Sequence, residues 1–484
     1  MTDTIFALSS GHGKAGVAVV RVSGADLRGV WDNVVRPVVS SRGTANAANP
    51  GSGGATVLPK LHRSAQQYPH PIPDSFAREK APQNFRDDTI IPRHAYLSDL
   101  TDNSGGIIDR AIAIYFAAPN SFTGEDVIEF HTHGSAAVIE KLFETLRLMG
   151  ARMAEPGEFT RRAFDNGKMD LVEVDGLVAL LDARTDAQRR AALRSAAGAD
   201  SAVYENWRSQ MIEIAAYSAA MLDYPADELP ENIGKNLLER TKNLHAGISG
   251  ALSRAGAARA VRAGFNIALV GPVNSGKSSI FNRLVGESRA IVSDIPGTTR
   301  DVVSAELDID GYLVRLLDTA GLRKTTNKVE KMGIARTQDL IETADLVIRV
   351  QSVECGVWSE KLKDNEILVY NKDDLYNNST LHTPHSTLVS ALTGAGIPEL
   401  LTRIRAEIHA RLDEAESELV VNARTKTLLE EAAAELANST EHTANMDLFT
   451  EHVRRAADAI GRILGLISAA EVMDATFGQL CLGK

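Results

Sequence analysis

The sequence is poor in three features that would assign it to particular classes of protein. It has only two cysteines in 484 residues, Cys355 and Cys481, which excludes a disulfide framework and fits a reducing compartment. No apolar run reaches the roughly 18 residues that a membrane span needs. Lys and Arg number 52 against 63 Asp and Glu, a net charge of −11. This balance excludes a uniformly basic nucleic-acid coat but not a local basic patch.

The N-terminus also lacks a cationic leader, because an apolar segment follows Met1 within a few residues. We therefore expect a cytoplasmic protein. Hydrophobic residues make up 44% of the chain and charged residues 24%, which is typical of globular proteins with real cores. The length leaves room for roughly three domains.

Periodicity divides the chain into an N-terminal α+β domain, a helical domain and an α/β domain. Residues 168–262 and those after 414 have helical spacing, whereas 264–407 alternate strand and helix patterns, which predicts a parallel sheet. The expected architecture is an α/β domain inserted into an all-α domain. Residues 41–90 are rich in Pro, Gly, Ser and Ala and predict a long flexible insertion. The expected domains are 1–165, 166–263, 264–407 and 408–484.

The stretch Gly271–Ser279 reads G-x-x-x-x-G-K-S-S between a strand pattern and a helical pattern. This context is typical of a phosphate-binding loop, whose backbone N–H groups surround a phosphate at the positive end of a helix. We expect Lys277 to reach the β- and γ-phosphates and Ser278 to give its hydroxyl to Mg²⁺. The alternative, an ordinary glycine-rich turn, is disfavoured because three further motifs follow in order.

Each of these three motifs ends a strand pattern. Asp318-Thr319-Ala320-Gly321 is D-x-x-G. Its Asp would hold the ligand shell of Mg²⁺, and the N–H of its Gly would donate to the γ-phosphate. Asn371-Lys372-Asp373-Asp374 is N-K-x-D, and the Asp374 carboxylate would accept from the ring N–H and amino group of guanine, which adenine lacks. Ser390-Ala391 would present a backbone N–H to guanine O6. Together the motifs predict that the inserted α/β domain is a Ras-like P-loop G domain that binds GTP.

The switch region is less clear than these motifs. Gly297-Thr298-Thr299-Arg300-Asp301 suits a switch segment in which one of the two threonines coordinates Mg²⁺, and the spacing does not say which; a polar turn is the alternative. Leu322 stands where Ras-type enzymes carry the water-orienting Gln. Either hydrolysis is therefore very slow, or another group stabilises its transition state. Asn274 offers an oxygen where K⁺ would bridge the phosphates in place of an arginine finger.

Segments in all three domains resemble the MnmE (TrmE) family of tRNA-modification GTPases, over nearly the full length of the chain. They are Thr4–Ala7 (T-I-F-A), Ala18–Gly24 (A-V-V-R-V-S-G), Pro119–Glu129 (P-N-S-F-T-G-E-D-V-I-E), Pro156–Phe164 (P-G-E-F-T-R-R-A-F), Asn166–Leu171 (N-G-K-M-D-L) and Cys481–Lys484 (C-L-G-K). These segments are more specific than the phosphate loop alone.

The resemblance implies that the N-terminal domain is similar to a tetrahydrofolate-binding module and forms a homodimer. Arg21, Glu129, Lys168 and Lys484 match the family's contacts to the cofactor, 5-formyl- or 5,10-methylene-tetrahydrofolate. With the flavoprotein MnmG, in a heterotetramer, the chain would use this one-carbon unit to add a (carboxymethyl)aminomethyl group at C5 of the wobble uridine of certain tRNAs.

The resemblance also implies roles in the G domain. Glu330 matches the residue that helps to orient the attacking water. Lys277 would be a second catalytic residue, at the phosphates. The paired G domains would dimerise across their nucleotides, with K⁺ promoting it. The expected K⁺ site is Asn274, Ser293, Ile295 and Thr298, and the Mg²⁺ site is Ser278 with Thr299. The expected GTP contacts are Asn274, Ser275, Gly276, Lys277, Ser278, Ser279, Ser293, Asp294, Ile295, Pro296, Gly297, Thr298, Thr299, Asp318, Thr319, Ala320, Gly321, Asn371, Lys372, Asp374, Ser390 and Ala391.

Some residues keep two interpretations. Cys481 is either a functional, catalytic thiol beside the folate or a small residue packed under the terminal lysine. His131 and His133 form H-x-H on one face of a strand, but no third metal ligand is nearby in sequence. Glu125 and Asp126 are either a catalytic pair or, as we favour, groups that orient a loop.

Two further questions stay open. The basic run of Arg184, Arg189, Arg190 and Arg194 either contacts tRNA phosphates or forms a solvated face, which we favour slightly. The whole chain is either the tRNA-modifying GTPase or a ribosome-assembly or signalling GTPase that only recruits partners. The guanine loop has Leu392 where many family members carry Lys, so nucleotide affinity is expected to differ.

Overall fold

The computed structural model describes residues 3–11, 13–37, 90–223, 232–291, 303–318, 342–355, 362–375 and 386–466. The chain divides into compact units, one holding Met1–Lys168 and the other Met169–Thr476. Apart from its last residue, the predicted insertion at 41–90 lies outside the described ranges. Within those ranges, no helix combines the length and the apolar character needed to cross a membrane.

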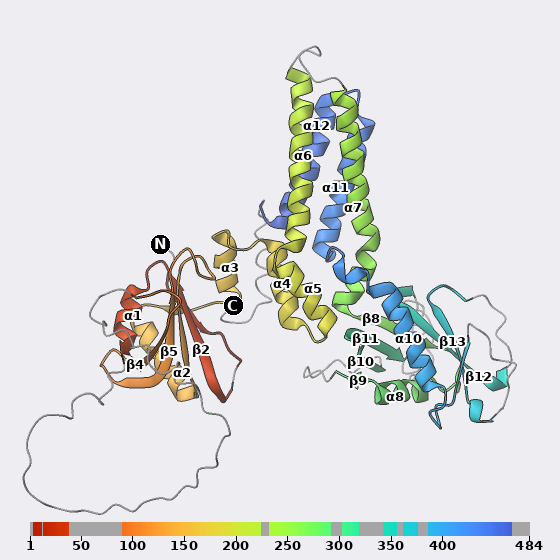
Figure 1. Ribbon diagram of the computed structural model, residues 1–484, viewed down its shortest axis with the longest axis horizontal. Coiled ribbons are helices and arrows are strands. Elements are labelled where there is room, and N and C mark those ends of the chain that lie inside the picture. The colour runs from red at the N-terminus through yellow and green to blue at the C-terminus, as the bar shows by residue number, and fades with distance from the viewer. Residues whose placement is uncertain are drawn as a thin grey trace, which may run out of the picture. The chain divides into compact units, whose positions relative to one another are not determined.

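The first unit is built on a seven-stranded sheet in the order β3-β4-β5-β6-β2-β1-β7 (Figure 1). All neighbours are antiparallel except β1 and β7. The elements are β1 (Ile5–Leu8), β2 (Ala15–Gly24), α1 (Arg28–Val34), β3 (Val35–Pro37), β4 (Ala95–Thr101), β5 (Ile107–Phe116), β6 (Asp126–Gly134), α2 (Ala136–Leu148), β7 (Arg152–Met153) and α3 (Glu158–Asp165).

The two-residue period of the strands gives this sheet one covered face and one polar face. Val22 and Phe130 pack with Trp31 of α1 and Leu142 of α2 in a single buried cluster, so both helices cover the same face. Residues that alternate with these point the other way. Arg21 of β2 lies directly opposite Glu129 of β6 on that second face.

The second unit contains the α/β domain, whose sheet has the order β14-β13-β12-β8-β11-β10-β9. Five strands are parallel, as predicted, but β10 pairs antiparallel with both β11 and β9. The reason is the two-residue turn Asp310-Gly311, in which both residues have positive φ, the geometry of a tight hairpin. The elements are β8 (Phe265–Val270), α8 (Lys277–Glu287), β9 (Arg289–Ala290), β10 (Val303–Ile309), β11 (Tyr312–Asp318), β12 (Leu346–Ser352), η3 (Val353–Cys355), β13 (Glu366–Asn371), η4 (Asp373–Leu375), β14 (Ser386–Val389) and α10 (Ile397–Leu412).

Helices from before and after this domain form one bundle. Met211, Leu244, Leu436 and Phe449, from α6, α7, α11 and α12 respectively, belong to the same buried cluster. The two helical segments of the sequence therefore make a single core, and the α/β domain is inserted between them, as predicted (Figure 1). The helical elements are α4 (Leu171–Asp182), α5 (Asp186–Ala196), α6 (Ala199–Asp223), α7 (Ile233–Ala263), η6 (Ala415–Ser417), α11 (Ala423–Glu441) and α12 (Met446–Leu464).

The turn of the β10–β11 hairpin is held from two sides by flanking helices. On the α5 side, the Ala187 N–H donates to Gly311 O at 3.0 Å. On the α10 side, the Tyr312 hydroxyl donates to Asp413 at 2.9 Å, and His409 bridges Asp413 and Asp310 at 2.8 and 3.2 Å. The hydrogen bond to Asp413, and to a smaller extent the one to Asp310, raises the pKa of His409. This favours the charged imidazolium between the two carboxylates.

Candidate functional site

The phosphate loop lies between the end of β8 at Val270 and the start of α8 at Lys277. Gly276 caps α8 in a left-handed conformation, φ 89°. A Cβ at this position would lie 2.0 Å from the Asn371 side-chain nitrogen, so the loop can close against Asn371 only with glycine. The last turn of the predicted loop is thus fixed by a contact with a distant strand.

The side chains at the start of α8 face the positions expected for phosphates and Mg²⁺. The Lys277 ammonium donates to Gly271 O and Pro272 O at 2.9 and 2.8 Å, which places its charge inside the loop. The Ser278 hydroxyl donates to Asp318 Oδ2 at 2.7 Å. Because Mg²⁺ prefers hard oxygen ligands, this hydroxyl and carboxylate fit that ion as a donor pair.

At the other end of the site, Asn371 joins two loops. Its Nδ2 donates to Ser275 O of the phosphate loop at 3.0 Å, and its Oδ1 accepts from the Ala391 N–H at 3.0 Å. The Ser390 hydroxyl donates to Asp374 Oδ1 at 2.5 Å and orients that carboxylate. The Ala391 N–H was predicted to donate to guanine O6, but it already donates to Asn371. A hydrogen bond to the base would therefore require this N–H to donate to both acceptors.

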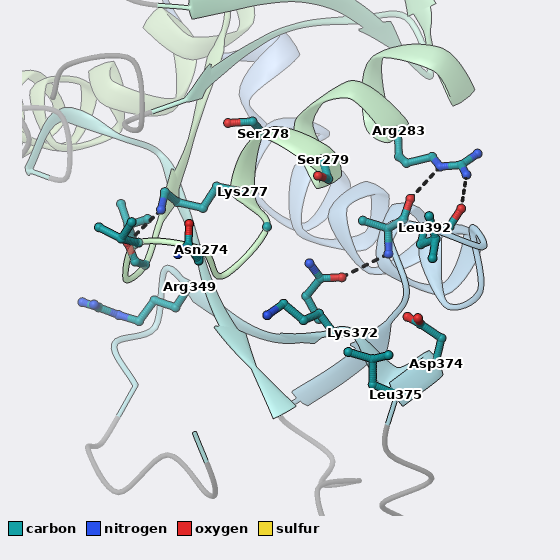
Figure 2. Close-up of a pocket in the computed structure, with 16 residues that line it drawn as sticks. Asn274, Lys277, Ser278, Ser279, Arg283, Arg349, Lys372, Asp374, Leu375 and Leu392 are labelled. Atoms are coloured by element: carbon teal, nitrogen blue, oxygen red, sulfur yellow. Dashed lines mark hydrogen bonds between the residues drawn. The ribbon is translucent and has the colours of Figure 1, made fainter. Parts of the chain in front are cut away.

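These elements enclose a cavity of about 1040 Å³ (Figure 2). Its lining contains the motif residues Asn274, Gly276, Lys277, Ser278, Ser279, Asn371, Lys372, Asp374 and Ala391. Arg283, Arg349, Leu375 and Leu392 line it as well. Arg283, Arg349 and Leu375 were not predicted as site residues, because no local motif marks them and only the fold brings them to the cavity.

In the first unit, two of the residues matched to a folate site form an ion pair. Arg21 donates through Nε and Nη2 to Glu129 Oε1 at 3.0 and 2.9 Å, and its guanidinium lies over the rings of Phe122 and Phe159. Lys168 donates to Pro119 O at 3.0 Å. These contacts all involve the segment 119–122 or the strand pair β2–β6.

Comparison with known proteins identifies the family. The family model of the MnmE helical domain matches residues 171–481, and that of the GTP-binding protein TrmE N-terminus matches residues 44–168. The chain is 36% identical to the tRNA modification GTPase MnmE of Parvibaculum lavamentivorans, over 100% of both chains. It is 34% identical to the protein of the same name from Agrobacterium fabrum, over 100% of this chain and 99% of that one.

The chain belongs to the MnmE family of tRNA modification GTPases. Membership confirms the expected resemblance and the expectation that the chain is a GTPase. Among solved structures, the G domain of the T. maritima FeoB iron transporter is 27% identical over 30% of this chain and 98% of that one, with a TM-score of 0.22. A score this low supports no argument.

Several site residues expected from the motifs or from the MnmE resemblance lie outside the described parts of the chain, and their roles stay predictions. They are Ser293, Asp294, Ile295, Pro296, Gly297, Thr298, Thr299, Thr319, Ala320, Gly321, Glu330, Cys481 and Lys484.

The acidic pair of this MnmE-family N-terminal domain has structural partners. Glu125 accepts from Arg162 and Ser23, each at 2.9 Å, and is buried. Asp126 accepts from the Tyr115 hydroxyl at 2.6 Å and the Ala118 N–H at 2.9 Å. Both carboxylates therefore hold the loop that leads into β6, which agrees with the favoured interpretation.

The two histidines of the H-x-H pair have separate acidic neighbours. His131 faces Glu129 at 3.4 Å and His133 faces Asp109 at 2.8 Å. Within the ranges that the structure describes, no three His, Cys, Asp or Glu side chains form a group that suits a metal ion.

The basic run that begins at Arg184 and continues along α5 forms a set of ion pairs. Arg184 pairs with Glu306 of β10, and Arg190 with Glu416 at 2.6 Å. Arg189 pairs with Asp186 at 2.8 Å. Arg194 pairs with the buried Asp200 at 3.0 Å. The four side chains remain 30–53% exposed, which agrees with the favoured solvated face, while contact with tRNA phosphates stays a prediction. The pairs of Arg184, Arg190 and Arg194 also tie this run to neighbouring elements.

The guanine end of the cavity generates a specificity prediction. Asp374→Asn replaces an acceptor by an amide that can donate to the C2 carbonyl of xanthine but not to the amino group of guanine. We expect GTP affinity to fall by about 100-fold or more, because hydrogen bonds to a charged group contribute about 1.5–3 kcal/mol each, and XTP affinity to rise.

Equilibrium binding of fluorescent GTP and XTP analogues checks this result. The neighbouring Asp373→Asn is the matched control and should leave both affinities near the wild-type values. An Asp374→Asn protein that binds GTP as tightly as the wild type would contradict the assignment.

Proposed function

We propose that GTP hydrolysis by this chain drives the modification of C5 of the wobble uridine in certain tRNAs, with the flavoprotein MnmG as partner and a tetrahydrofolate one-carbon unit as donor. The names of its full-length relatives support the tRNA substrate. The Arg21–Glu129 pair and the nearby Lys168 support a folate site, where Lys484 and Cys481 would complete the set.

One observation carries the nucleotide half of this proposal. A single cavity has the Lys277 and Ser278 side chains at one end and Asp374 at the other. The Ser278 hydroxyl donates to Asp318. The first group suits a phosphate chain with Mg²⁺, and the second suits the N–H edge of guanine. Guanosine triphosphate has these two features at opposite ends, so one ligand would satisfy both groups.

A monovalent cation completes the proposed hydrolytic site. Asn274, which lines the cavity with positive φ, would hold K⁺ together with Ser293, Ile295 and Thr298. The cation would supply positive charge beside the phosphates, and Glu330 would orient the attacking water. Homodimers would form through the N-terminal domains, and their G domains would meet across the nucleotides.

We also propose the domain limits. The N-terminal domain takes residues 1–165 and the helical domain takes 166–263 and the last segment. Helix α10 crosses the boundary expected at 407–408, and Ile408, Leu412 and Ala415 are buried with the sheet of the G domain. We therefore extend the G domain from 264 to about Ser417.

The proposed function predicts a change in tRNA chemistry. In cells that lack this chain, mass spectrometry of tRNA nucleosides should show wobble uridines without the C5 substituent. A plasmid carrying the wild-type gene should restore the modified nucleoside, whereas Ser278→Ala, which removes the proposed Mg²⁺ ligand, should not. Unchanged nucleosides in the deletion strain would sink the proposal.

The cation site predicts a dependence on K⁺. GTP turnover should be at least about tenfold faster in K⁺ than in Na⁺ of equal ionic strength, because the ion replaces a missing positive group. Asn274→Ala should remove most of this difference. Asn282→Ala, an exposed asparagine on α8, is the control and should keep it. Equal rates in both salts for the wild type would refute the site.

The folate site separates this proposal from a GTPase that only recruits partners. Titration of the full-length protein with 5-formyl-tetrahydrofolate should show binding, and Arg21→Ala should weaken it by about tenfold or more through loss of a charged contact. Arg110→Ala, on the same sheet, is the control. Thermal unfolding of each variant shows whether the domain still folds. A wild-type protein that binds no folate would favour the alternative, a ribosome-assembly or signalling switch.

A further inference from the structure

Arg283 lies on α8, six positions after Lys277, and lines the nucleotide cavity away from the phosphate loop. Its Nε donates to Ala391 O at 2.9 Å and its Nη2 donates to Leu392 O at 2.6 Å. Figure 2 shows both bonds reaching from α8 to the loop after β14. One guanidinium therefore holds two successive carbonyls of the loop that follows Ser390.

The same loop is held on its other side by the N-K-x-D segment. The Ala391 N–H donates to Asn371, and the Ser390 hydroxyl donates to Asp374. The Ala391 residue thus has its N–H fixed by Asn371 and its carbonyl fixed by Arg283. Removing Asn371 would free the Ala391 N–H, and removing Arg283 would free the Ala391 carbonyl, in the residue that would face the base.

Beyond Ala391 the loop is closed by hydrogen bonds within itself, such as the Gly394 N–H to Ser390 O at 2.8 Å and the Ser390 N–H to Ala395 O at 2.9 Å. These bonds fix the shape of the loop but do not reach α8. Leu392 is 77% exposed, so its side chain has no core to anchor it. Its side chain also carries no hydrogen-bond donor. The position of this loop relative to α8 therefore depends on backbone carbonyls, and Arg283 is the side chain that reaches them.

Arg283 also shares its helix with the residues that face the phosphates. Lys277 and Ser278 begin α8, and Arg283 lies in its second turn. A guanine nucleotide spans from the start of this helix to Asp374 and Ser390. A rigid tie between helix and loop fixes the spacing of the two ends before the ligand arrives, which lowers the ordering cost of binding.

We propose that Arg283 is a positioning residue for the guanine base, which sets the affinity and residence time of guanine nucleotides without acting on the reacting phosphates. This inference rests on the proposed function of the cavity as a GTP site. It goes further by assigning to one helix residue the coupling of the phosphate end to the base end.

The test uses the full-length protein and a fluorescent GDP analogue. Arg283→Ala should raise the dissociation rate and the Kd by about tenfold, in line with the loss of charged hydrogen bonds. KM for GTP should rise similarly, while kcat at saturating GTP stays within about twofold. Arg283→Lys keeps the charge but cannot donate from two guanidinium nitrogens, so its dissociation rate and Kd should lie between those of the wild type and of Arg283→Ala.

Arg405→Ala is the matched control, because Arg405 is an exposed arginine on α10 that faces Asp310 and does not line the cavity. It should leave all these constants unchanged. If Arg283→Ala and Arg283→Lys lower only the unfolding temperature and keep wild-type Kd and dissociation rate, the arginine is merely structural and the inference fails. A wild-type protein that binds no guanine nucleotide would instead overturn the proposed function.

Discussion

The amide of Asn371 is the interaction on which the nucleotide site depends. It donates to the phosphate loop through Ser275 O and accepts from the guanine loop through the Ala391 N–H, so it fixes both ends of the cavity from the end of β13. Its contact with the phosphate loop is possible only because Gly276 has no Cβ. The glycine of the G-K-S motif is therefore required for loop-to-loop packing as well as for the left-handed conformation that begins α8.

A second constraint is that both helical segments are needed to make one core. Neither α6 with α7 nor α11 with α12 forms a separate buried cluster; the four share one, and the G domain is inserted between them. Local sequence could reveal this because each segment has its own helical period while the intervening residues alternate with strands. The interface between α5 and the hairpin could not be predicted in this way. Arg184, just before α5, pairs with Glu306 of the hairpin, and Arg190 pairs with Glu416 of η6; each partner is more than 100 residues away in sequence.

The same distinction explains what the sequence predicted of the site. The helical spacing of residues 168–262 and the strand–helix alternation of 264–407 were predictable, because these periods are local. The phosphate loop was predictable since its residue types act at fixed offsets. The contacts of Arg283 and the pairing of Arg21 with Glu129 join residues 108 or 109 positions apart, and only strand order and register bring them together. The antiparallel β10 did have a local signal, the Asp-Gly turn, which the strand–helix alternation obscured.

That hairpin links the nucleotide cavity to the helical domain through one strand. β11 ends at Asp318, the partner of Ser278, and begins at Tyr312, whose hydroxyl donates to Asp413 just after α10. Because β11 is paired with β10 along its whole length and with β8 from Val314 to Asp318, it resists sliding. A shift of Asp318 along the strand axis must therefore break ladder hydrogen bonds or move the turn that Ala187 and His409 hold. Since α5 belongs to the helical domain and α10 ends the G domain, the hairpin joins the carboxylate beside the expected metal to α5 and to the segment that leads out of the G domain.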